Sequence, residues 1–143
     1  APQFQFIKMS PQSAAYIESV RVCLDDYPSD HVAILPDGPG LYPLLGIANP
    51  FDSDWWLRAE RVFDKTDRDL RTIEELNDKG NFLVLRQSYS VFSLRGMKTL
   101  DVDIRANGES YFDDPLDSKI FENLNGVEIS CSSFTGKYKS NGP

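Results

Sequence analysis

Carboxylates crowd one stretch of the chain, and their positions could support chemistry. Residues 101–128 carry eight acidic side chains against two basic ones. Asp101 and Asp103 are two residues apart, so they share one face of a predicted strand. An Asn-Gly pair at 107–108 predicts a tight hairpin turn, which would bring Asp113 and Asp114 back towards them. These four aspartates are the candidate metal ligands.

Three interpretations fit this acidic cluster. Its oxygen ligands suit a divalent cation such as Ca²⁺. Crowded carboxylates raise one another's pKa, which suits the acid and base of a glycosidase-like hydrolase. A solvated, charged sheet face needs no ligand and is the simplest interpretation. The spacing of the aspartates leaves all three open.

Other catalytic sets are missing from the sequence. His31 is the single histidine, which excludes paired-histidine mechanisms, and no nucleophile-elbow motif accompanies it. Gly38-Pro39-Gly40 places a proline where a phosphate-binding loop needs a backbone N–H. We therefore expect no cofactor, and we expect a protein without catalytic activity rather than an enzyme.

The formal net charge of −7 narrows the choice of partners. A negative field repels phosphate backbones, so we expect no binding to nucleic acid. No apolar run reaches the roughly 18 residues that span a bilayer, so we expect no membrane span. The charge suits a basic partner, a bound cation or solubility alone.

An apolar, turn-rich segment precedes a pair of tryptophans. The stretch PDGPGLYPLLGIANPFDSDWW, residues 36–56, contains chain breakers that forbid long regular structure. Its leucines, Tyr42 and Ile47 are too apolar to leave in water, so the segment must cover the core or contact a partner. On a helix Trp55 and Trp56 point about 100° apart, so both cannot face inward. The candidate binding residues are Tyr42, Leu44, Trp55 and Trp56.

Cys23 and Cys131 are the only two cysteines. Neither has a second cysteine at zinc-ligand spacing. A bridge between them would close a loop of roughly a hundred residues and contribute about 4–5 kcal/mol in the chain-entropy model. The start Ala1-Pro2-Gln3, without methionine, fits removal of a signal peptide, excision of methionine before a small residue, or a trimmed chain. We therefore expect a disulfide and a secreted protein; two free thiols would instead indicate the cytoplasm.

The hydrophobic period changes along the chain from helical to alternating. Helices are predicted at 11–25, from Asp52 or Ser53 through the tryptophan pair, and from Thr66 or Asp67 to Gly80. Strands are predicted at 4–8, 31–35, 82–86, 89–94, 100–105, 109–112 and 127–134. We expect a single domain over residues 1–143, with a loose tail at about 136–143.

This order of elements predicts an α+β fold. N-terminal helices would pack on one face of a largely antiparallel sheet, formed mainly by the C-terminal half. Our first hypothesis for function is a small, secreted, non-catalytic binding protein, an effector-like module. It would engage a protein or glycan partner through the apolar loop and exposed aromatic side chains. The alternatives are a carboxylate-dependent hydrolase and an acidic intracellular inhibitor of a basic enzyme.

Overall fold

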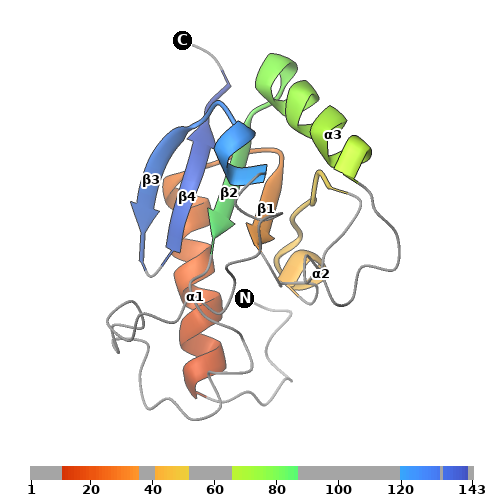
Figure 1. Cartoon of the computed structure of the whole chain (residues 1–143). Coiled ribbons are helices and arrows are strands. Elements are labelled where there is room, and N and C mark those ends of the chain that lie inside the picture. The colour runs from red at the N-terminus through yellow and green to blue at the C-terminus, as the bar shows by residue number, and fades with distance from the viewer. Residues whose placement is uncertain (1–10, 36–40, 52–65, 87–119, 133, 142–143) are drawn as a thin grey trace, which may run out of the picture.

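The computed structural model describes residues 11–35, 41–51, 66–86, 120–132 and 134–141 (Figure 1). Its helices are α1 (Pro11–Asp26), α2 (Leu41–Leu45) and α3 (Thr66–Lys79), and residues 120–123 form a further helical turn. Its strands are β1 (Val32–Leu35), β2 (Phe82–Arg86), β3 (Val127–Cys131) and β4 (Phe134–Lys139).

The strands form a four-stranded sheet in the order β1-β2-β4-β3. β1 pairs with β2 in parallel, while β4 is antiparallel to both β2 and β3. The parallel pair needs a crossover connection, and α3 lies within it. Helices at the N-terminal side and a mainly antiparallel sheet confirm the predicted α+β class.

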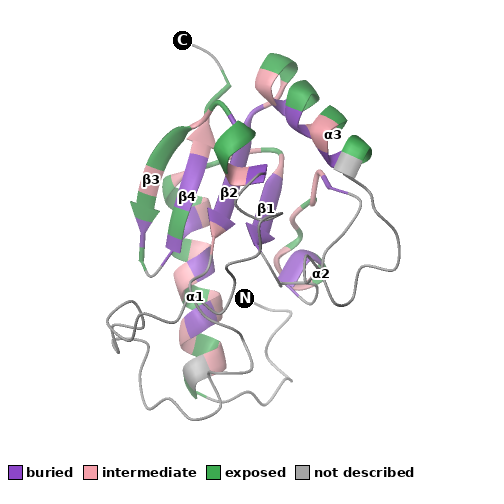
Figure 2. Cartoon of the chain, in the orientation of Figure 1, coloured by how far each residue is buried: buried purple, intermediate pink, exposed green. Residues whose placement is uncertain are grey.

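Both faces of the sheet carry apolar side chains into a core. Val32, Ile34, Leu83 and Leu85 pack with α1 on one face. The alternate residues of the same strands, such as Val84, pack with α3 and residues 120–124 on the other face. This explains why β1 and most of β2 read as continuous apolar runs, which Figure 2 shows as buried.

α1 follows the predicted helix at 11–25 closely. Pro11 occupies its first position, where the missing N–H costs nothing. Tyr16, Val20 and Cys23 form the buried stripe, at most 2% exposed, and Tyr16 lies against the ring of Phe134. Helical spacing thus orients one face of α1 onto the sheet.

α3 also confirms the predicted helix, and its end has a clear cause. The N–H of Gly80 donates to the carbonyl of Leu76 at 3.2 Å. A Cβ at Gly80 would lie 3.1 Å from the Leu76 side chain, so a larger residue would crowd the turn. Lys139 of β4 donates its Nζ to the carbonyls of Leu76 and Asn77. A cation therefore lies at the negative end of the α3 dipole.

The predicted loose tail is wrong for residues 136–139, which belong to β4. The polar composition of this segment suggests exposure to water, but Lys137 is buried, with 9% of its surface exposed. The Lys137 Nζ donates to the carbonyl of Leu124 at 3.0 Å and lies 5.1 Å from the ring of Phe121. Lysine stems pack well on apolar surface once the charged end has a partner.

The run predicted as one strand at 127–134 is instead divided by a turn. Ser132 has a φ of 53°, the left-handed conformation that tight hairpin turns use. Cys131 and Phe134 pair on either side of this turn. The predicted helix after Asp52 and the predicted strands at 4–8 and between 89 and 112 lie outside the described residues.

The outer edge of β1 is closed by the segment that follows it. The N–H of Val32 donates to the carbonyl of Ala48 at 3.1 Å. The N–H of Ile34 donates to the buried hydroxyl of Tyr42 at 3.0 Å. Such contacts protect an edge strand from pairing with another chain.

We predict that Tyr42→Phe lowers the free energy of unfolding by about 1–3 kcal/mol, because it leaves the buried N–H of Ile34 without a partner. Tyr138→Phe is the matched control, since its hydroxyl donates to the Pro28 carbonyl at an exposed position where water can substitute. Urea denaturation of both variants measures the difference. Equal stabilities would show that the Tyr42 hydroxyl does not hold the edge.

Candidate functional site

The strongest candidate surface is the edge loop, residues 41–51, which runs along β1. Leu41 and Tyr42 are buried, and Leu45 and Ile47 pack against the same core cluster as α1. At its other end Phe51 is 4% exposed and packs on the opposite face of the sheet. The edge loop therefore wraps the sheet edge and joins both cores.

Local hydrogen bonds define the shape of the edge loop. The N–H of Ile47 donates to the carbonyl of Tyr42 at 3.1 Å, which closes α2. Gly46 has a φ of 64°, a conformation that favours glycine after a helix. The N–H of Phe51 donates to Oδ1 of Asn49 at 3.1 Å, which forms a further turn. Turn chemistry, rather than a long helix or strand, thus shapes this apolar segment.

The sequence-predicted binding residues fall into different environments. Tyr42 is 5% exposed, and its hydroxyl bonds to the backbone of β1, so this side chain serves the fold. Leu44, also on α2, is half-buried, while Pro43 and Ala48 are exposed. Trp55 and Trp56 lie outside the described residues. The outward surface of the loop therefore includes Pro43, Leu44, Gly46 and Ala48.

The predicted metal ligands Asp101, Asp103, Asp113 and Asp114 also lie outside the described residues, so the cation and hydrolase hypotheses stay predictions. Within the described ranges, no group of three or more His, Cys, Asp or Glu residues could hold a metal ion.

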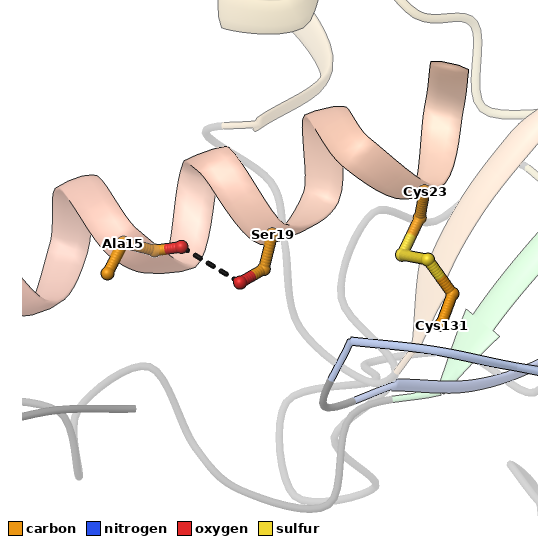
Figure 3. The surroundings of a disulfide bond; sticks show 4 residues. All are labelled: Ala15, Ser19, Cys23 and Cys131. Carbon is orange, nitrogen blue, oxygen red and sulfur yellow. Dashed lines mark hydrogen bonds between the residues drawn. A yellow bond between two sulfur atoms is a disulfide. The ribbon is translucent and has the colours of Figure 1, made fainter. Parts of the chain in front are cut away.

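The predicted disulfide is confirmed. Cys23 of α1 bonds to Cys131 at the end of β3, across a sequence separation of 108 residues (Figure 3). Their Cα atoms are 5.8 Å apart, within the usual range for a disulfide. Both residues are buried, at 0% and 6% exposure, which removes the bond from ready attack by an external thiol. It links the helical layer to the edge of the sheet.

Two polar groups that hold the fold were not identified from the sequence. Asn81 is 4% exposed; its Oδ1 accepts the N–H of Asp30, and its Nδ2 donates to the Asp30 carboxylate at 2.7 Å. Asn77 similarly bonds to the Asn123 carbonyl and the Asn125 N–H. Each pair is about fifty residues apart in sequence, so no local pattern could reveal it.

A basic and aromatic cluster surrounds Phe121. The guanidinium carbon of Arg86 lies 5.9 Å from the centre of the Phe121 ring, and the Nζ of Lys137 lies 5.1 Å from the same ring centre. The Lys137 Nζ also donates to the Leu124 carbonyl, so its positive charge contacts residues 120–124. The cluster fastens that segment to the sheet and supplies no reactive group.

No helix in the described part of the chain is both long and apolar enough to cross a membrane. Comparison with protein-family models, with curated proteins and with solved structures finds no match to this chain.

We predict that the double variant Cys23→Ala/Cys131→Ala loses about 4–5 kcal/mol of unfolding free energy, because its unfolded chain regains the entropy of an open loop. Val22→Ala on the exposed side of α1 is the control and should change stability by less than about 0.5 kcal/mol. Chemical denaturation measures both. A double variant as stable as the control would contradict a stabilising role for the disulfide.

Proposed function

We propose that this chain is a secreted, non-catalytic binding protein that engages a protein partner through the outer surface of the edge loop. The observation that carries the proposal is the buried Cys23–Cys131 disulfide. Disulfides of this kind form and persist in oxidising compartments and are rare in the cytosol. The disulfide supports secretion, and the anchored loop supports binding.

The anchoring of the edge loop favours recognition. Contacts from Tyr42 and Ala48 to β1 hold the loop before any partner arrives, so little conformational entropy is lost on binding. Pro43 and Ala48 are exposed beside the half-buried Leu44. Apolar, non-aromatic groups suit the core of a protein interface better than the stacking surface of a sugar site.

Secretion has a direct chemical test. The protein isolated from its natural source, unfolded without reductant and treated with an alkylating reagent, should gain no alkyl group by intact mass. Uptake of two alkyl groups would place the chain in a reducing compartment and would overturn the secreted assignment.

Binding is tested with a photo-crosslinking residue at position 44, which identifies the partner in the fluid or tissue of origin. We expect Ala48→Arg to weaken that partner's affinity by about thirtyfold, because a bulky charge enters the apolar interface. Ala48 is exposed and bonds to β1 only through its backbone carbonyl, so the fold should persist.

Val22→Arg is the matched control, since Val22 is also exposed and apolar but lies on α1. It should leave the affinity unchanged. If Val22→Arg weakens binding and Ala48→Arg does not, the partner uses α1 and the edge loop is only a cover for the core.

A further inference from the structure

The two edges of the sheet differ in how their backbone groups are satisfied. In a strand, successive residues direct their N–H and C=O groups to opposite sides. The N–H of Leu83 donates to the carbonyl of His31 at 2.9 Å, so Leu83 faces β1 and Val84 faces β4. This one bond sets the direction of every backbone group across the sheet.

The pairing register of the strands shows which backbone groups of β4 and β3 face each other. Val84 pairs with Lys137, so the Lys137 backbone faces β2 and that of Gly136 faces β3. Gly136 pairs with Ile129, so the Ile129 backbone faces β4. It follows that Glu128 and Ser130, the neighbours of Ile129, direct their N–H and C=O groups away from the sheet.

The residues that carry these outward groups are solvent-exposed, whereas the residues of β1 are buried. Glu128 and Ser130 are exposed, and Val127 beside them is 71% exposed. Within the described residues β3 pairs only with β4. Figure 1 shows β3 on the side of the sheet opposite to β1, which the edge loop covers. One edge is thus closed, and in the described part of the chain the other edge has no neighbouring strand.

Side chains along this edge alternate in character. Val127, Ile129 and Cys131 lie on the face that α1 covers, and Glu128 and Ser130 lie on the other. An added strand would therefore place apolar residues beside Val127 and Ile129. Directly opposite Glu128 it would favour a lysine or arginine, because opposite charges on neighbouring strands attract.

The carboxylate of Glu128 has no ion-pair partner among the described residues. Lys137 is its neighbour in register, but the Lys137 Nζ bonds to the Leu124 carbonyl. The chain as a whole carries −7. Local and overall charge therefore both favour a basic occupant and oppose a second copy of this chain.

We propose that the outer edge of β3 binds an extended, basic segment of a partner protein, which adds a strand to the sheet. Hydrogen bonds to the outward N–H and C=O groups of Glu128 and Ser130 supply affinity. The partner segment should alternate apolar and basic residues, because its side chains would lie beside Val127 and Ile129 on one face and Glu128 on the other. This site is separate from the edge loop and does not depend on it.

The test uses a synthetic peptide of about eight residues that alternates valine with lysine, and a second peptide with glutamate in place of lysine. By fluorescence anisotropy, the lysine peptide should bind at least about fivefold more tightly, and added salt should weaken it. Its binding should slow hydrogen exchange at the amides of Glu128 and Ser130. No binding, equal binding of both peptides, or no change at these amides would overturn the proposal.

Two variants test the mode of binding. Ser130→Pro removes an outward N–H that no strand of the sheet uses, so it should abolish binding, whereas Ser130→Ala keeps that N–H and should bind normally. Should the proline variant unfold, Glu128→Lys decides, because it should reverse the preference towards the glutamate peptide. Concentration-dependent dimerisation that protects the same amides without peptide would assign the edge to a second copy and overturn the partner assignment.

Discussion

Every backbone N–H and C=O group in a sheet needs a partner or water, and this need determines how the sheet ends. The bond from Leu83 to His31 orients the whole ladder and so decides which residues face outward at each edge. At β1 those residues are Val32 and Ile34, and the edge loop satisfies both of their N–H groups. At β3 they are Glu128 and Ser130, which face solvent. The remaining features follow from this asymmetry.

The apolar edge loop is explained by the closed edge. A loop whose hydroxyl and carbonyl oxygens accept hydrogen bonds from β1 must lie against the core, so Leu41, Tyr42 and Phe51 are buried there. The disulfide performs a different task at the other side of the sheet. It fastens Cys131 of β3 to α1. This bond holds the edge strand β3 in place without using its outward backbone groups. A strand that is paired with β4 on one side and held by a covalent bond can leave its outer edge open and still be ordered.

Local sequence patterns predicted α1, α3, β1 and β2 because helical stripes, alternation and apolar runs are properties of a few neighbouring residues. The disulfide was predictable because Cys23 had one possible partner. β4 was missed because Lys137 is buried among partners distant in sequence, including Leu124 and Phe121, which no local pattern indicates. For the same reason no local pattern indicates that the Tyr42 hydroxyl bonds to β1, and the predicted role of Tyr42 in binding stays a prediction. The aspartates of the acidic cluster lie outside the described residues, so their role stays a prediction.

Native-state hydrogen exchange of the protein alone, read residue by residue by NMR, tests the asymmetry between the two edges most directly. We predict slow exchange at Val32 and Ile34, whose N–H groups bond to the edge loop, and at Ile129, whose N–H faces β4. We predict fast exchange at Glu128 and Ser130. Protection at Glu128 and Ser130 equal to that of Ile129, or fast exchange at Val32 and Ile34, would contradict the assignment of a closed and an open edge.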